Sequence, residues 1–430
     1  MTAFYDRSIL VVVSLLILIG LTGVYSSTSV ISPDVMEKQA GKQSTLSQFH
    51  YVKKQVFTAI LGLLALIAAS RLPLETIKKL VIPLLVISLI GVLLVFTPLG
   101  VRAGGARRWL RLWPSAFQPS ELVKLSVVLF LAWYASSEHF RKDSVASFVI
   151  PIGVMVVFQG IFIKQPDFGA VMSLGIITMF LLFLAGTRMR YLLCLSGAAL
   201  PVVVMLAMKP YRLKRILAFL DPWADPQGSG FQLIQSYIAL GSGGVAGIGL
   251  GEGKQKLAFL PEAHTDFIFS IIGEEVGLIG AIAVVILFLF LFLRGVAIAR
   301  GAKDPNDLFA YYLAFGISIM IALQAAINFA VVTGMVPTKG LPLPFISYGG
   351  SSLIVSMTAI GLLLNISRRT ATAAEASGAD AIGKGAGDNP PAPAMGQIPA
   401  TSPLRWDRGF GYSRYRRSTP AGRDHPEDDR

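Results

Sequence analysis

Long apolar stretches separated by short polar ones recur along almost the whole chain. Ten of these stretches are long enough to cross the roughly 30 Å of bilayer hydrocarbon as α-helices. The pattern predicts spans at 8–26, 52–70, 80–97, 120–136, 147–163, 168–185, 191–208, 267–293, 308–332 and 346–366. It therefore predicts an all-α polytopic integral membrane protein with about ten transmembrane helices.

Composition agrees with this class. Of 430 residues, 53% are hydrophobic and 15% are charged, whereas a soluble domain has about 25% charged residues. The first apolar stretch is too long for a signal peptide and lacks a clear cleavage site, so we expect it to be retained. Residues 1–369 would form the membrane domain. The Ala-, Gly- and Pro-rich residues 370–430 would form a disordered cytoplasmic tail.

Ten crossings place both termini on one side of the membrane. Lys and Arg in the short loops slightly favour the cytoplasm for that side. The segments expected outside are also basic, which indicates a polyanionic ligand on the outer face. The largest outer segment is the loop 209–265, between the seventh and eighth spans. Its glycines resemble a dinucleotide fingerprint only superficially, because no strand precedes them.

Two outer segments mix basic residues with aromatic ones. The loop 98–119 contains "GARRWLRLW", with Arg108 at its centre. This mixture predicts a short helix in the headgroup layer, acting either as a simple anchor or as a phosphate contact. Arg212, Lys214 and Arg215 follow the seventh span. They form either a pyrophosphate-binding patch or a solvated basic face.

The stretch "PEAHTDFIF" places Glu262, His264 and Asp266 directly before the eighth span. If this segment is helical, the two carboxylates share a face, which would raise the pKa of one of them and suit it to general-base catalysis. A helix N-cap at Thr265 or Asp266 is an alternative. A metal site is less favoured, because no second His or Cys lies nearby. Glu274 and Glu275, deeper in the span, are expected to have a structural role.

Further polar residues stand at other span ends. In "QPSELVK", Gln118, Glu121 and Lys124 open the fourth span, and ionisable groups at that depth indicate either function or a structural ion pair. "KQPDFG" joins the fifth and sixth spans. Pro-Asp-Phe-Gly alone indicates a turn, but Lys164 beside Asp167 at a cavity mouth is more than a turn requires. Lys339 and Ser347 lie in the Pro-rich segment before the last span, where irregular backbone is tolerated only beside a cavity or inside protein.

Together these motifs resemble the SEDS family (shape, elongation, division and sporulation) over about residues 8–369. They are more similar to its division and sporulation members than to its elongation members. The resemblance implies ten transmembrane helices and a peptidoglycan glycosyltransferase that polymerises lipid II on the outer face of the inner membrane. It implies a class B penicillin-binding protein as partner, with other division proteins at the septum, and no nucleic acid. It implies that Asp266 is essential and that Glu121, Lys124 and Asp167 are functional.

These expectations combine into one site hypothesis. Asp266 would be the general base for the acceptor hydroxyl, and cations would stabilise the departing pyrophosphate. The residues expected to contact lipid II or the nascent glycan strand are Arg108, Gln118, Glu121, Lys124, Lys164, Asp167, Arg215, Glu262, His264, Lys339 and Ser347. No cofactor is required by this hypothesis, although Mg²⁺ or Mn²⁺ stays open. The alternatives are a lipid II transporter and a non-catalytic scaffold of the division machinery.

Overall fold

The computed structural model describes residues 6–28, 49–103, 106–112, 115–255, 264–303 and 307–385. The chain divides into two units, Met1–Gly378 and Ala379–Arg430. Of the second unit, only the end of one helix lies within the described residues.

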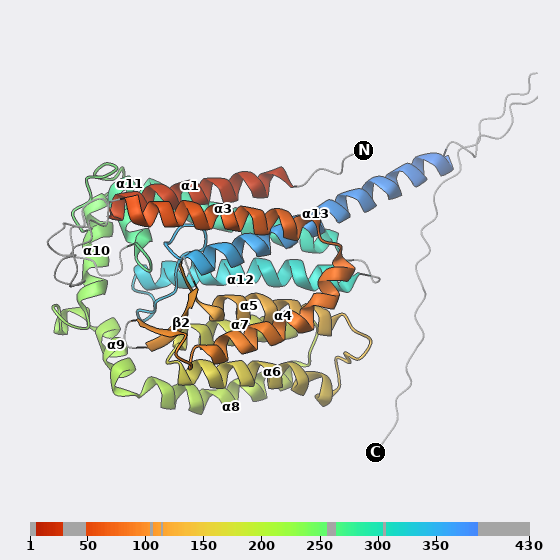
Figure 1. Ribbon diagram of the computed structural model, residues 1–430, viewed down its shortest axis with the longest axis horizontal. Helices are drawn as coiled ribbons and strands as arrows, with labels where there is room; N and C mark the ends of the chain where they lie inside the picture. Colours follow the sequence, from red (N-terminus) through yellow and green to blue (C-terminus); the bar gives the residue numbers. More distant parts are fainter. Residues whose placement is uncertain are drawn as a thin grey trace, which may run out of the picture. The chain divides into compact units, whose positions relative to one another are not determined.

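Long helices running side by side dominate the first unit (Figure 1), which confirms the predicted fold class. They are α1 Arg7–Thr28, α3 Phe49–Arg71, α4 Leu74–Leu94, α5 Pro119–Ala135, α6 Val145–Lys164, α7 Phe168–Leu184, α8 Met189–Ala207, α11 Ile268–Gly301, α12 Leu308–Val332 and α13 Gly350–Gly385. Each predicted span overlaps one of these helices. Among the described residues, eight helices have the length and composition to cross a membrane. Helices α5 and α7, at 17 residues each, are shorter, so ten crossings stay a prediction.

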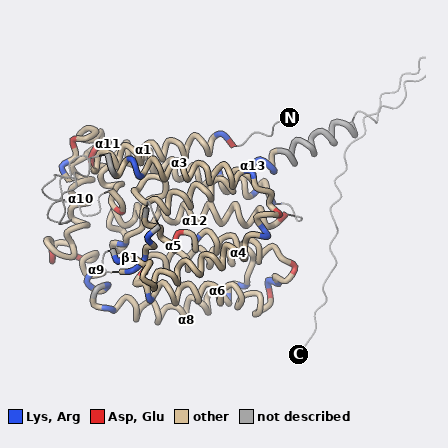
Figure 2. Tube along the Cα trace, in the orientation of Figure 1, with Lys and Arg blue, Asp and Glu red and all other residues tan. Residues whose placement is uncertain are grey.

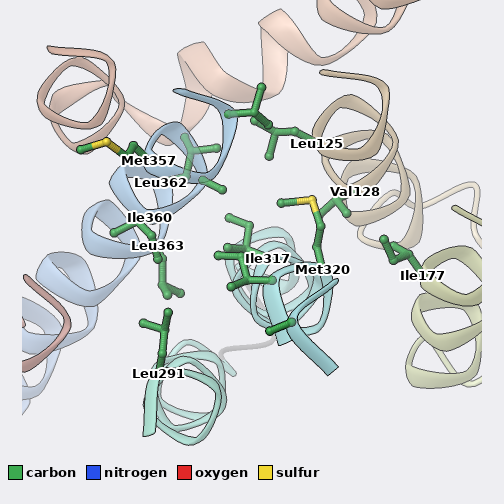
Figure 3. Packing of buried hydrophobic residues seen from close by; sticks show 14 of the residues in the cluster. Leu125, Val128, Ile177, Leu291, Ile317, Met320, Met357, Ile360, Leu362 and Leu363 are labelled. Carbon is green, nitrogen blue, oxygen red and sulfur yellow. The ribbon is translucent and has the colours of Figure 1, made fainter. Parts of the chain in front are cut away.

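The core lies where α5, α7, α11, α12 and α13 meet (Figure 3). Leu125 and Val128 of α5 and Met320 of α12 are buried there. Lipid offers helices little hydrophobic gain on association, so small residues that allow close packing matter more. At Gly361 of α13, an added Cβ would lie 2.4 Å from the carbonyl oxygen of Leu66. Glycine therefore lets α13 approach the backbone of α3.

The loop 98–119 contains an antiparallel sheet in the order β1-β2-β3, formed by Gly100–Ala103, Ala106–Leu112 and Ser115–Phe117. The predicted headgroup-layer helix is therefore wrong. Along β2, Ala106 and Leu110 are buried while Arg107 and Arg111 are exposed. β2 pairs antiparallel with both β1 and β3, which defines it as the central strand of the sheet. The Arg/Trp composition alone did not distinguish a helix from a strand.

The segment 209–265 is also more regular than a loop. It contains α9 Pro210–Leu220, the 3-10 turn Pro222–Ala224 and α10 Phe231–Gly243. Helix α10 buries Leu233, Ile234 and Ala239 and packs against α11. The segment that was expected to be an open polar loop thus covers one end of the bundle with helices.

Glu274 and Glu275 are buried in α11 and form hydrogen bonds to neighbouring segments. These contacts agree with the structural role expected for the two residues. The Glu274 carboxylate accepts hydrogen bonds from the backbone N–H groups of Lys254 and Gln255, at 2.8 and 3.2 Å. Glu275 accepts one from the Ser26 hydroxyl of α1 at 2.5 Å. Two residues later α11 is interrupted at Gly277, where φ is +73°.

Most of the charged residues lie toward the two ends of the bundle (Figure 2). The strands, α9, the α6–α7 turn and the segment 333–349 share one end, here called the sheet end (Figure 1). Ion pairs such as Arg294–Asp6, at 2.6 Å, and Lys78–Glu75, at 2.9 Å, lie at the other end. The segments predicted to share the outer face thus lie together at the sheet end.

Helix α13 continues past Arg369 to Gly385, into the range expected to be disordered. The sequence here is rich in Ala, the best helix former, which explains the continuation. Residues 386–430 lie outside the described residues, and disorder stays a prediction for them.

Candidate active site

The segment 333–349, between α12 and α13, organises the sheet end. It has no regular secondary structure beyond turns, so its backbone groups need partners from elsewhere. Side chains from three helices supply them. Arg215 of α9 donates to the Thr338 carbonyl at 3.2 Å, Asn328 of α12 to Leu341 at 2.8 Å, and Gln55 of α3 to Ser347 at 3.3 Å.

Asp266 lies beside this segment. A Cβ added to Gly340 would be 2.8 Å from Asp266 Oδ2, so the carboxylate packs against the glycine. The Asp266 carbonyl accepts a hydrogen bond from Asn328 Nδ2 at 2.8 Å. Helix α11 begins at Ile268 and its N-cap is Phe267. The N-cap alternative for Thr265 or Asp266 is therefore wrong.

The residues before Asp266 are also non-helical. Residues 264–267 form a turn, so the helical spacing considered for Glu262 and Asp266 does not hold at the Asp266 end. Glu262 itself lies outside the described residues. Asp266 is half-buried.

Ser347 and His264 meet at the same segment. The Ser347 hydroxyl donates to the Thr265 carbonyl at 2.6 Å and accepts from the Leu343 N–H at 2.7 Å. The His264 carbonyl accepts from the Tyr348 N–H at 2.9 Å, and the His264 ring centroid is 5.7 Å from that of Tyr348. Both residues therefore fix the backbone that precedes Asp266. Burial raises the pKa of Tyr348.

Asp167 stands at the N-terminus of α7. Its Oδ1 accepts from the Ala170 N–H at 3.2 Å, while Oδ2 is buried with no hydrogen-bond partner among the described residues. The next side chain, Phe168, faces two cations: Lys339 Nζ lies 4.8 Å and Arg212 Cζ 5.0 Å from its ring centroid. These are cation–π distances. Burial lowers the pKa of Lys339.

Arg108 approaches Asp167 from the sheet. Its guanidinium donates to the carbonyls of Pro166, at 2.5 Å, and Gln165, at 3.4 Å. Lys164, by contrast, is exposed at the end of α6. The described residues contain no ion pair between Lys164 and Asp167. Arg108, and not Lys164, is thus the basic residue held against the α6–α7 turn.

Glu121 and Lys124 form a buried ion pair, 2.9 Å apart. Lys124 Nζ also donates to Gln324 Oε1 at 2.6 Å, and Gln324 Nε2 donates to the Pro342 carbonyl at 3.0 Å. The pair therefore connects through α12 to the segment 333–349. Gln118 reaches α13, because its N–H donates to the Ser351 hydroxyl at 2.8 Å.

The arrangement has a chemical consequence. The Asp266 carboxylate lies next to a segment that carries Lys339 and is held by Arg215, and Lys339 and Arg212 both contact the Phe168 ring. Such a site can take a proton from a hydroxyl and stabilise negative charge on a phosphate. The described residues contain no group of three His, Cys, Asp or Glu side chains able to hold a metal ion.

A family model described as "Cell cycle protein", for the FtsW, RodA and SpoVE proteins, matches residues 6–372. The chain belongs to the FtsW/RodA/SpoVE family. This confirms the SEDS resemblance, and the match covers every described site residue.

Relatives of this FtsW/RodA/SpoVE family member carry specific names. This chain is 44% identical over 368 residues to the "Probable peptidoglycan glycosyltransferase FtsW" of Geobacter sulfurreducens, and the match covers 85% of this chain and 95% of that relative. The protein of the same name from Legionella pneumophila is 39% identical over 367 residues, covering 85% of this chain and 91% of that relative. The division-type similarity expected from the motifs agrees with these names.

Solved structures agree in fold. One, titled "Structural coordination of polymerization and crosslinking by a peptidoglycan synthase complex", matches with a TM-score of 0.67 and 30% identity, covering 85% of this chain and 98% of that one. The rod shape determining protein RodA of Thermus thermophilus matches with a TM-score of 0.61 and 26% identity, covering 85% and 97%.

Sequence reasoning missed three residues of this family member's site. Gln324 and Asn328 lie four residues apart on α12, and both are buried. Their spacing places them on one face of the helix. Two amides at helical spacing inside an apolar span were a usable signal, because buried polar groups in a membrane need partners. Phe168 was also overlooked, since its role depends on cations from distant segments.

Proposed function

We propose that this chain is a peptidoglycan glycosyltransferase that polymerises lipid II into glycan strands during cell division. The observation that carries the proposal is the meeting of Asp266, Lys339 and Arg215 on the segment 338–340. The names of the relatives, "Probable peptidoglycan glycosyltransferase FtsW", support the same reaction.

In the proposed reaction, Asp266 removes the proton from the acceptor's GlcNAc 4-hydroxyl. The hydroxyl oxygen attacks the anomeric carbon of the growing strand from the side opposite its α-linked pyrophosphate. The bond to the undecaprenyl pyrophosphate breaks, and the configuration inverts. The leaving group is already a good one, so it needs charge stabilisation and no acid; Lys339, Arg212 and Arg215 supply that stabilisation.

The remaining candidates have supporting roles in this proposal. Arg108 and Asp167 would shape the α6–α7 side of the substrate site, and the exposed Lys164 would contact the glycan or its peptide. Glu262, outside the described residues, stays a predicted substrate contact. Glu121, Lys124 and Gln118 would hold the inner wall, since the first two are paired and buried. His264 and Ser347 would fix the backbone before Asp266.

A lipid II transporter is the less favoured alternative. Transport would call for ionisable groups that lead on from the site toward the other end of the bundle. The buried carboxylates away from the site, Glu274 and Glu275, instead accept hydrogen bonds from loop N–H groups and from Ser26. These contacts favour an enzyme that works at one face.

We place the protein in the cell inner membrane, at the septum, with both termini in the cytoplasm and the sheet end outside. Its proposed partners are a class B penicillin-binding protein, other division membrane proteins and membrane lipids. A solved neighbour that takes part in a peptidoglycan synthase complex supports the first of these.

The test uses the purified full chain with a class B penicillin-binding protein, supplied with lipid II and scored for glycan strands. Asp266→Asn should lower the rate by 10²- to 10⁴-fold, the usual contribution of a general base. Asp225→Asn is the matched control, because Asp225 is an exposed carboxylate bonded to Ser229. Parallel reactions with Mg²⁺, Mn²⁺ or EDTA test for a divalent cation. Polymerisation by Asp266→Asn at the wild-type rate would refute the assignment.

A further inference from the structure

Asn328 is a buried side chain of α12 that bonds to both sides of the proposed site. Its Nδ2 donates to the Asp266 carbonyl and to the Leu341 carbonyl, both at 2.8 Å. Asn328 is 1% exposed, so water does not replace either bond. The two acceptors belong to segments about 75 residues apart in sequence, which makes Asn328 a tether between them.

Ser347 and Tyr348 hold the two residues before Asp266, whereas Asn328 holds the carbonyl of Asp266 itself. The turn 264–267 precedes α11 without a side-chain cap, because the N-cap residue Phe267 makes none. On the opposite side, Gly340 lies directly against the Asp266 carboxylate. A shift of the backbone at Asp266 or at Leu341 would therefore change where the carboxylate points.

We infer that Asn328 is a positioning residue that sets the orientation of Asp266 relative to Lys339 by holding both segments through their backbones. This inference rests on the proposed function, in which Asp266 is the base. Catalysis is sensitive to such geometry, since a displacement of about 1 Å can cost roughly 10²-fold in rate. Binding of the lipid substrate depends on many more contacts, so kcat should respond more than KM.

The chain contains a matched control at the other end of the bundle. Asn365 is also fully buried, and its Nδ2 also donates to two backbone carbonyls, those of Ala69 at 3.0 Å and Leu72 at 2.5 Å. In both asparagines Oδ1 has no partner among the described residues. Replacing either amide by Leu removes the donor from one buried and one part-buried hydrogen bond to the backbone, with a comparable effect on stability.

The experiment compares Asn328→Leu with Asn365→Leu in the full chain with its penicillin-binding partner. Asn328→Leu should lower kcat for lipid II polymerisation by about 10- to 100-fold and change KM by less than about threefold. Asn365→Leu should unfold at a similar temperature and keep kcat within about twofold of wild type. Asn328→Ser, which keeps one donor, should give an intermediate kcat and serves if Asn328→Leu does not fold. An Asn328→Leu protein with wild-type kcat, or equal kcat losses in the two Leu variants, would overturn the inference.

Hydrogen exchange separates this inference from the proposed function. Asn328→Leu should speed amide exchange in residues 264–267 and 338–343, and Asn365→Leu should speed it near residues 69–72 only. If wild type forms no glycan but this exchange pattern is found, the glycosyltransferase proposal fails and the tether stands. If wild type polymerises lipid II and exchange near Asp266 is unchanged in Asn328→Leu, the tether fails and the proposed function stands.

Discussion

The buried ion pair of Glu121 and Lys124 offers a sharp test of what ionisable groups do inside this bundle. Its atoms Oε1 and Nζ are 2.9 Å apart, and the two side chains are 5% and 3% exposed. At an effective dielectric constant of about 20, their attraction is about 6 kcal/mol before the cost of desolvation. Lys124→Met removes one charge and leaves the other buried. Breaking a buried pair in this way costs about 3–5 kcal/mol.

The cost is measured as thermal unfolding in detergent, where Lys124→Met should melt roughly 5–10 °C below wild type. The double variant Glu121→Gln, Lys124→Met removes both charges and should recover most of the loss, because a neutral buried pair needs no compensation. If the single variant melts with wild type, or if the double variant is as unstable as the single one, the electrostatic reasoning is refuted. A stable double variant that no longer polymerises lipid II would show a functional role beyond stability.

Two further perturbations follow from the backbone and from burial. Gly277→Ala should destabilise the fold by about 1–3 kcal/mol, since φ there is +73° and the new Cβ would lie 2.3 Å from the Gly247 nitrogen; a melting temperature equal to wild type would contradict this. Burial lowers the pKa of Lys339 below its ordinary 10.5, so the unfolded chain keeps the proton to higher pH and stability rises as pH approaches 10.5. The Lys339→Met variant should therefore have a higher melting temperature than wild type at neutral pH, and the difference should disappear near pH 10.5. A difference in melting temperature that does not depend on pH would exclude burial of the charged lysine as its cause.

Much of the bundle was predictable because a membrane span has a strong local signal, a run of apolar residues of defined length. The sheet at 100–117 was not predictable, because its longest strand has only seven residues and contains the aromatic and basic residues that are typical of an interfacial helix. The interruption of α11 at Gly277 was equally hidden. It depends on the Ile248 and Gly249 N–H groups, which donate to the carbonyls of Glu274 and Glu275 at 3.1 Å, a pairing that local sequence does not encode.

Some residues of the candidate site could likewise be predicted from the sequence, and others could not. Asp266 could be identified from sequence because a cluster of titratable groups before an apolar span is unusual. The alternative structural role, a helix N-cap, was wrong because the helix begins two residues after Asp266, at Ile268. Lys164 was expected beside Asp167 from their closeness in sequence, yet the last turn of α6 leaves Lys164 exposed. Arg108, more distant in sequence, takes the position because the sheet folds back over the α6–α7 turn.

The way the segment 333–349 satisfies its backbone explains why such a site can work at a membrane surface. Irregular backbone near hydrocarbon requires partners, and water would be the simplest source. Here the carbonyls of Thr338, Leu341 and Pro342 are taken by Arg215, Asn328 and Gln324 instead. Side chains in these bonds hold the segment in place, and Lys339 within it is half-buried. A positive charge that is fixed in advance and partly shielded from water would act more strongly on a developing phosphate charge than a freely solvated one. The buried amides of α12 therefore contribute to the electrostatics of the proposed reaction without touching the substrate.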